Sequence, residues 1–227
     1  MKKFILLFAA LTLLSIDVVS QEIPRMRPKD RLIFGLFTDV WSNLPGDMET
    51  KTINRGVTID YLQDFPISTS NFSFAVGLGF ASHNIYSDHS FAVDYIEDGF
   101  VYNFSPINPQ LDYDNNKLSL NYLNIPIEIR FRTRNTPQTF RIHAGVKAGL
   151  LIDAHTKYVG EVTPNGREIK LKEGKLDNIQ SFMFGFHGRI GYGRINLNTF
   201  VNLTDIFEGN NAQDASLVSL GLSLIIF

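Results

Sequence analysis

The chain has 227 residues, a formal net charge of −2 from 21 basic and 23 acidic residues, and no cysteine. That length suits one domain, and the near balance of charge gives no reason to expect a nucleic-acid partner. The absence of cysteine excludes disulfides and lipid attachment through an N-terminal cysteine.

The first 20 residues have the three parts of a secretory signal peptide. Lys2 and Lys3 form the positive start, residues 4–16 the apolar run, and residues 18–20 the small-residue cleavage site. The apolar run is too short for a membrane-spanning helix, which needs roughly 20 residues. We predict a signal peptide at 1–20, a periplasmic N-terminal lead-in at 21–30, and one domain over 31–227.

The rest of the sequence repeats segments in which apolar and polar residues alternate with period two, as in strands that have one apolar face. No later segment is a long apolar run, so an exported chain that crosses a membrane must cross it as strands. The alternating segments are 32–41, 53–62, 71–82, 118–132, 139–154, 178–192, 195–204 and 215–227.

The segment 71–82 distinguishes between two kinds of barrel. One of its faces holds bulky apolar residues and the other holds only serine, alanine and glycine. Small residues inside and bulky residues outside suit a narrow barrel in lipid, whereas a soluble lipocalin-like barrel puts bulky residues inside. This strand therefore favours the membrane.

The connections between the eight segments alternate between longer and shorter ones, and the longer ones are 42–52, 83–116, 155–177 and 205–214. Outer-membrane barrels have an even number of strands, short periplasmic turns and longer outer loops. We therefore predict an all-β fold, a single eight-stranded antiparallel up-and-down transmembrane β-barrel. It would sit in outer-membrane lipid with both termini in the periplasm.

The segment 118–132 gives the most specific prediction about the two faces. Its lipid-facing residues are predicted to be Leu123, Ile125, Ile127, Ile129 and Phe131. Pro126 would face the lumen, where a bulge tolerates its missing ladder hydrogen bond.

Two changes of parity complicate this pattern. The apolar residues Leu118, Leu120 and Tyr122 have the opposite parity, which predicts a bulge near Tyr122–Leu123. In the last segment the even-numbered residues are apolar, which turns Phe227 inward unless a bulge resets the register.

The polar faces of three successive strands carry charged and histidine side chains that a barrel would enclose. Charges in a narrow lumen must pair or stay hydrated, because burying one unpaired costs several kcal/mol. We predict a structural charge network that plugs the barrel, with no catalytic residue, cofactor or metal. Its members are Glu128, Arg130, Arg132, Arg141, His143, Lys147, Asp153, His187 and Arg189.

An alternative interpretation makes this lumen a catalytic site. His143 or His187 would be a general base that Glu128 or Asp153 orients, as in a lipid-modifying barrel enzyme. No serine nucleophile stands in an obvious relation to either histidine in the sequence. The second alternative is a soluble lipocalin-like binding barrel.

The connection 83–116 is acidic, rich in aromatic residues and long for a barrel of this size. We predict that it either docks a partner or folds over its own barrel as a lid. His83, Asp88 and His89 could ligate a metal, but three such residues in a flexible loop are common by chance, and no metal site is predicted. The aromatic residues of this candidate partner loop are Tyr86, Phe91, Tyr95, Phe100, Tyr102, Phe104 and Tyr113.

Several short motifs occur together in one order. Tyr122-Leu123-Asn124-Ile125-Pro126 is followed by a glycine-bearing stretch at 144–149, by Gly191-Tyr192-Gly193, and by a final 219–222 run before a terminal Phe. In these motifs the chain resembles the PorT-like outer-membrane β-barrel proteins of Bacteroidetes, which have a Tyr-Leu-x-Ile-Pro strand. The resemblance implies a non-enzymatic barrel, structural or accessory to an envelope assembly, and the family's namesake is associated with protein secretion.

Overall fold

The computed structural model describes residues 30–43, 48–96, 99–174, 176, 179–208 and 215–226, without the side chains of 92–96 and 99–103. The predicted signal peptide, residues 21–29 of the predicted lead-in and Phe227 lie outside the described residues.

Strands make up the regular structure of the described residues. None of these residues belongs to a helix that is long and apolar enough to cross a membrane. The strands are β1 (Leu32–Ser42), β2 (Arg55–Pro66), β3 (Phe72–Tyr86), β4 (His89–Ile96), β5 (Gly99–Pro106), β6 (Tyr113–Arg132), β7 (Phe140–Glu161), β8 (Glu168–Gly174), β9 (Phe182–Tyr192), β10 (Ile195–Asn202) and β11 (Ser216–Ile226).

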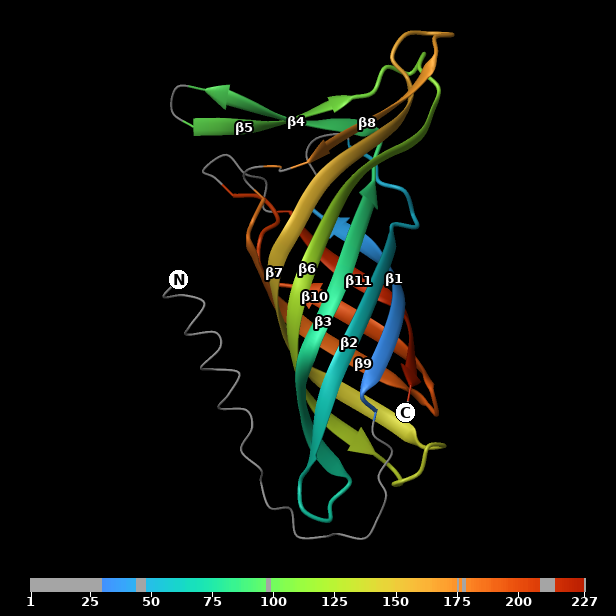
Figure 1. Ribbon diagram of the computed structural model, residues 1–227, viewed down its shortest axis with the longest axis vertical. Coiled ribbons are helices and arrows are strands. Elements are labelled where there is room, and N and C mark those ends of the chain that lie inside the picture. Colours follow the sequence, from blue (N-terminus) through green and yellow to red (C-terminus); the bar gives the residue numbers. More distant parts are fainter. Residues whose placement is uncertain are drawn as a thin grey trace.

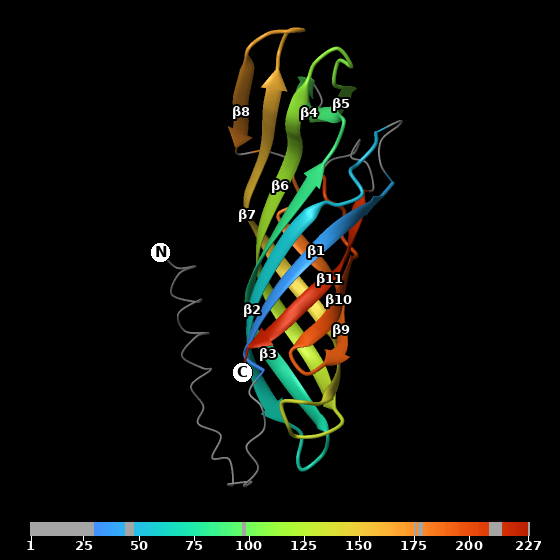
Figure 2. The same cartoon turned by 90° about the vertical axis from the view of Figure 1, so that its right-hand side faces the viewer.

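Eight of these strands close into an antiparallel barrel (Figures 1 and 2). The wall runs in the order β6-β3-β2-β1-β11-β10-β9-β7, and the pairing of β6 with β7 joins its two ends. Closure satisfies the backbone groups of every wall strand on both sides, as a strand structure in lipid requires. The predicted eight-stranded up-and-down barrel is confirmed.

Three further strands lie beyond one end of the wall. β8 pairs with the distal part of β7, and β4 pairs with β5 in a separate hairpin (Figure 2). The connections 83–116 and 155–177, which were predicted without strands of their own, therefore contain strands. We call this end the loop end, and the opposite end, where Leu32 and Ile226 pair, the turn end.

The two faces of the wall differ in chemistry, because successive side chains of a strand point to opposite sides. Leu123, Ile125, Ile127 and Ile129 point outward and are 38–58 % exposed. Phe131 lies in the same outward series and its ring packs against Phe72 of β3, with ring centroids 5.1 Å apart. The predicted lipid-facing residues of this strand thus lie on the outer face.

Pro126 faces the lumen, but no bulge accompanies it. It lies opposite Lys147 of β7 in an unbroken register. In the pairing of β6 with β3, the ladder lacks the pairs of Ile125 and Pro126. The register is the same before and after this gap. Because proline lacks only its N–H donor, the sheet loses a hydrogen bond without inserting a residue.

The bulge predicted near Tyr122–Leu123 does not lie on β6 itself. Leu118, Leu120 and Tyr122 continue the inward-facing series of even-numbered residues and are at most 6 % exposed. The even-numbered residues of β6 from 118 to 132 all face inward. At the loop end the lumen is apolar, so these inward residues are apolar there and polar towards the turn end.

A register shift does occur at this level, on the neighbouring strand. Asn121 pairs with Asp153 and Tyr122 pairs with Leu151, which leaves Ile152 of β7 without a partner. This extra residue is a β-bulge that reverses which β7 side chains face the lumen. In contrast, β11 holds one register against β1 over its whole length.

Candidate functional site

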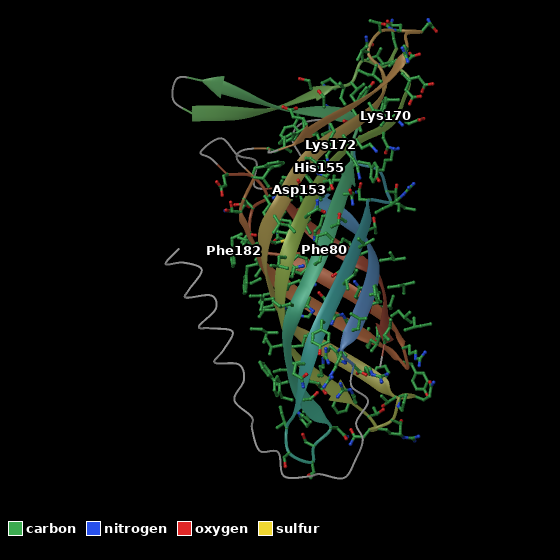
Figure 3. The ribbon with its side chains drawn as sticks, viewed as in Figure 1. Phe80, Asp153, His155, Lys170, Lys172 and Phe182 are labelled. Atoms are coloured by element: carbon green, nitrogen blue, oxygen red, sulfur yellow. The ribbon has the colours of Figure 1, made fainter. Side chains whose placement is uncertain are left out.

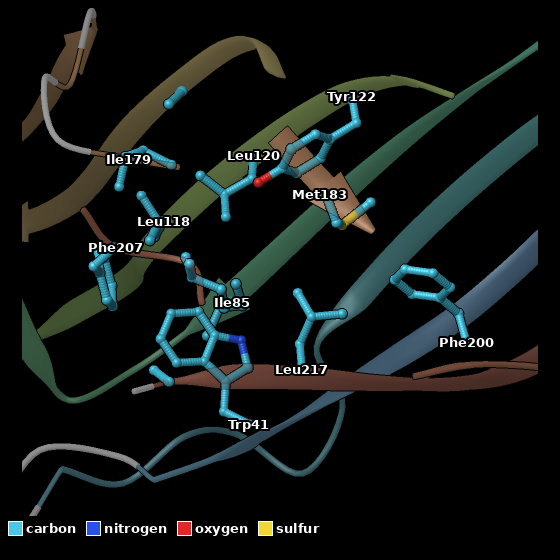
Figure 4. Close-up of a cluster of buried hydrophobic side chains, with 13 residues drawn as sticks. Trp41, Ile85, Leu118, Leu120, Tyr122, Ile179, Met183, Phe200, Phe207 and Leu217 are labelled. Carbon is cyan, nitrogen blue, oxygen red and sulfur yellow. The ribbon is translucent and has the colours of Figure 1, made fainter. Parts of the chain in front are cut away.

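The lumen of the barrel is the candidate site, and it changes from charged to apolar along its axis. At the loop end, Trp41, Leu120, Tyr122, Met183 and Leu217 belong to a buried apolar cluster that is drawn from across the barrel (Figure 4). Towards the turn end, the inward side chains are charged. Glycine and alanine on β3, β7 and β9 leave room for these long side chains.

Asp30 and two arginines form the first level, next to the turn end. The fully buried carboxylate of Asp30 accepts hydrogen bonds from Nε of Arg132 and Nε of Arg141, both at 3.1 Å. Arg141 also donates to the backbone carbonyl oxygen of Gly193, in the turn that joins β9 to β10. Asp64 of β2 accepts from Nη1 of Arg132 at 3.1 Å.

Glu128 is the centre of the second level and is fully buried. Its carboxylate accepts a hydrogen bond from Nε of Arg130 at 2.8 Å and another from Nη1 of Arg189. The Nδ1 atoms of His143 and His187 each lie 3.7 Å from one of its oxygens. Four side chains from β6, β7 and β9 therefore surround one carboxylate.

Asp60 of β2 continues this level across the lumen. Its Oδ2 accepts a hydrogen bond from Nη2 of Arg189 at 2.8 Å and lies 3.6 Å from Nζ of Lys147. Arg189 thus bridges Glu128 on β6 and Asp60 on β2. This bridge connects opposite parts of the wall through charged groups.

Asp39 of β1 forms the third level, below the apolar cluster. It pairs with Nδ1 of His83 at 2.9 Å and accepts a hydrogen bond from the hydroxyl of Ser219. The His83 ring also packs against the rings of Phe37 and Tyr122, with centroids 4.9 and 5.9 Å away. These contacts join the charged levels to the apolar cluster.

The formal charges of these levels balance when the histidines are neutral. Buried charges persist when they are paired and hydrogen-bonded, and Asp30, Asp60, Asp64 and Glu128 each have a cationic partner. Asp39 instead pairs with His83, which is a cation only when it is protonated, and accepts a hydrogen bond from Ser219. The five carboxylates are Asp30, Asp39, Asp60, Asp64 and Glu128, and the five cations are Arg130, Arg132, Arg141, Lys147 and Arg189.

The lumen cavity beside His187 is too small for a lipid or peptide substrate, and His143 does not line it. It has a volume of about 30 Å³ and is lined by His187, Arg189, Lys147 and Phe200 among others. That volume is close to the space that one water molecule occupies. The catalytic interpretation of His143 and His187 therefore gains no support from the geometry.

Eight of the nine predicted network residues are buried in the lumen, and Asp153 is not. Its side chain is 50 % exposed on the outer face of β7, where it binds Asn121 and His155. The bulge at Ile152 reverses the parity of β7 just before Asp153, so a residue that alternation places inside lies outside.

The sequence interpretation missed most of the carboxylates of the network. Asp39 and Asp60 lie on the inward faces of β1 and β2, and Asp30 precedes β1. A signal for them existed, because the predicted network held far more cations than carboxylates. Buried cations without partners predict acidic residues on the strands that face them.

The predicted partner loop divides into several structures. Phe91 and Phe104 lie at the base of the β4–β5 hairpin, and both rings contact Phe207 of the apolar cluster. Tyr86 ends β3, and Tyr113 begins β6 and stacks on Tyr158. The side chains of Tyr95, Phe100 and Tyr102 lie outside the described residues.

The three potential metal ligands do not come together. His83 pairs with Asp39 inside the lumen, whereas His89 pairs with Asp88, whose side chain is 44 % exposed. Among the described residues there is no group of three or more histidine, aspartate or glutamate side chains arranged to hold a metal ion.

The match to a family model agrees with this fold. Residues 26–208 match the family model described as outer membrane protein beta-barrel domain. Comparison with curated proteins gives no match. Among solved structures, the chain is similar to Ail, the attachment invasion locus protein of Yersinia pestis, in complex with the heparin analogue sucrose octasulfate. The identity is 11 %, the TM-score is 0.37, and the similarity covers 85 % of this chain and 94 % of that chain. Because the family model matches most of its length, the chain belongs to the outer membrane protein beta-barrel domain family and is an outer-membrane β-barrel protein.

Proposed function

We propose that this protein is a plugged, non-enzymatic barrel that serves as a structural or accessory component of an envelope assembly. The observation that carries the proposal is the filled lumen. Charged pairs occupy it from Asp30 to Asp39, and the apolar cluster occupies it at the loop end. A barrel with such an interior is suited to presenting surfaces rather than to passing solutes.

The finer assignment is to the PorT-like proteins of Bacteroidetes, with protein secretion as the process. The Tyr122–Pro126 strand, the glycine-bearing stretch at 144–149 and the Gly191–Gly193 turn support it. In the proposed orientation both termini are periplasmic, so the turn end faces the periplasm and the loop end faces the outside.

The loop end offers a surface for a partner protein. A cavity of about 550 Å³ lies between the β4–β5 hairpin and the extended part of β6, β7 and β8, and is lined by Phe91, Ile107, Leu111, Tyr158 and Leu171 among others. Leu171 of β8 is 54 % exposed. A cavity that combines apolar side chains with polar and charged ones is typical of a site that takes an apolar side chain of a partner and orients it through polar contacts.

Leu171→Glu should remove the partner protein that co-purifies with the tagged chain from native membranes in mild detergent. The substitution places a charge in the cavity, while an exposed position on β8 leaves the wall unchanged. The matched control is Lys170→Gln, which makes the same change of net charge on the opposite face of β8. Co-purification that Leu171→Glu leaves intact would contradict a docking role for this cavity.

The orientation can be tested by single cysteines, because the chain has none of its own. We expect Arg167→Cys, before β8, to react with a membrane-impermeant maleimide on intact cells. Thr136→Cys, in the turn between β6 and β7, should react only after the outer membrane is permeabilised. The opposite pattern of labelling would reverse the orientation.

A further inference from the structure

A row of cations crosses the outer face of the sheet at the loop end, where β8 extends it beyond the wall. Lys117 of β6, Lys157 of β7 and Lys172 of β8 lie directly opposite one another in the sheet. Directly opposed residues point to the same side, and like charges in such positions repel one another. Three opposed lysines therefore destabilise this part of the sheet in the absence of an anion.

The row continues on the other side of Lys117 around an aromatic ring. Tyr86 of β3 is paired with Lys117, and three cations lie over its ring. Nζ of Lys51, Cζ of Arg55 and Nζ of Lys117 are 5.7, 5.9 and 5.8 Å from the ring centroid. We call Lys51, Arg55, Lys117, Lys157 and Lys172 the basic row.

Carboxylates do not neutralise the basic row. Among the described residues, no ion pair includes any of its five members. Lys117 donates a hydrogen bond to Oδ1 of Asn84 at 2.6 Å, which is a neutral partner. Burial lowers the pKa of the Lys117 ammonium, and the charges of Lys157 and Lys172 lower it further.

The acidic side chain of Asp153 lies towards the row, and it has other partners. The Asp153 carboxyl, whose pKa is lowered chiefly by its hydrogen bond with His155, also feels the charge of Lys172. It accepts a hydrogen bond from Asn121 at 2.9 Å as well. Asp153 therefore offsets only part of the positive charge.

The exposed apolar residues of the outer face form a band that we call the apolar belt. The height of the basic row above this belt indicates which kind of anion it meets. Towards the loop end, Leu123 is the last exposed apolar residue of β6, and Lys117 lies six residues beyond it. Six residues span about 20 Å of strand, and the usual tilt of 35–45° makes this about 15 Å along the membrane normal. In Figure 3, Asp153, His155, Lys172 and Lys170 lie progressively farther above the level of Phe80 and Phe182.

Small polar residues occupy the space between the apolar belt and the basic row. Ser82 and Asn121 form one pair across β3 and β6. Asn84 forms the next pair with Ser119, which is buried and donates a hydrogen bond to Asn84, so Ser82, Asn84 and Asn121 are the half-buried polar side chains on this face. Hydroxyl and amide groups suit the hydroxyl groups of sugars, and the cations beyond them suit phosphate. The outer face thus changes from apolar to hydrogen-bonding to cationic in the order in which a glycolipid changes from acyl chain to sugar to phosphate.

We propose that the basic row binds the phosphorylated saccharide headgroup of a glycolipid in the outer leaflet. The site rests on the orientation given under the proposed function, since the loop end must face outward. The headgroup phosphates replace the missing carboxylates and remove the repulsion between the opposed lysines. The barrel is thereby anchored to its lipid on the β3–β6–β7–β8 side.

The test measures binding of the purified full-length barrel in neutral detergent to lipopolysaccharide whose core sugars carry phosphate. Lys157→Gln with Lys172→Gln should weaken this binding about 30-fold, which corresponds to about 2 kcal/mol. The control pair, Arg134→Gln with Arg167→Gln, makes the same change of net charge outside the row and should change binding less than twofold. An equal loss in the control pair would refute the site.

Two further binding measurements identify the anion. Lipopolysaccharide dephosphorylated with hydrofluoric acid should bind the unmodified chain as weakly as the lysine variant binds the native lipid. Binding that dephosphorylation leaves unchanged would overturn the proposal, and complete displacement by millimolar inorganic phosphate would assign the site to free phosphate instead. Because the assay is done in detergent, its result does not depend on orientation, so the cysteine labelling and the binding can fail separately.

Discussion

Glu128→Gln should lower the free energy of unfolding of the barrel by about 3–5 kcal/mol, as expected when one partner of a buried ion pair is removed. Glu128 is fully buried and accepts hydrogen bonds from Arg130 and Arg189. Without its charge, both guanidinium groups stay in the lumen with a neutral amide between them. The measurement is denaturant unfolding of the barrel in lipid vesicles, followed by tryptophan fluorescence and gel migration.

A matched control and a double variant separate the charge from the side chain. Glu168→Gln, at the exposed start of β8, removes the same charge and should change the free energy by less than about 0.5 kcal/mol. Combining Glu128→Gln with Arg189→Met should restore part of the loss, because removing both partners leaves fewer unpaired charges. A loss below about 1 kcal/mol for Glu128→Gln alone would contradict the central role of this carboxylate.

Ile127→Arg should destabilise the barrel by about 2–4 kcal/mol in lipid vesicles, the cost of an arginine on the lipid face near the bilayer midplane. Ile127 lies in the middle of the exposed apolar series of β6, between Leu123 and Phe131. The same substitution on the water-facing side of a soluble barrel would change stability by no more than about 0.5 kcal/mol. The result therefore distinguishes a lipid face from a solvated one.

The control for Ile127→Arg is an exposed isoleucine outside the belt. Ile67 follows β2 at the turn end and is 49 % exposed. Ile67→Arg should cost no more than about 1 kcal/mol, because a charge near the interface can reach water. Equal costs at the two positions, measured by the same unfolding experiment, would argue against a belt centred on Ile127.

The wall of the barrel could be predicted from the sequence because each strand has a different chemistry on each face. In β3, bulky residues such as Phe74 and Leu78 alternate with small ones such as Ala75 and Gly79, and this contrast indicates both the strand and its outward face. The contrast is weaker in the strands beyond the wall. In β8 the apolar face holds only Ile169 and Leu171 before Glu173, within a stretch rich in charged residues, so the short series is interpreted as part of a polar connection.

The lumen could be predicted only in part, because alternation fixes a face within a strand but says nothing of bulges or of opposite strands. Asp153 was placed inside because the bulge at Ile152 left no sign in the sequence. Asp60 was missed as a partner of Arg189 because their contact crosses the barrel between β2 and β9. Such contacts follow from the size and closure of the barrel rather than from local pattern.

The pairing of β1 with β11 joins Leu32 to Ile226, so one line of the wall depends on two strands that lie far apart in the sequence. Contacts between residues so far apart in sequence form slowly, because the loop between them must close first. This seam therefore cannot form before the final strand has been synthesised and inserted. A chain cut short before β11 would leave β1 and β10 with unpaired backbone groups in the hydrocarbon, a cost that only the last strand removes.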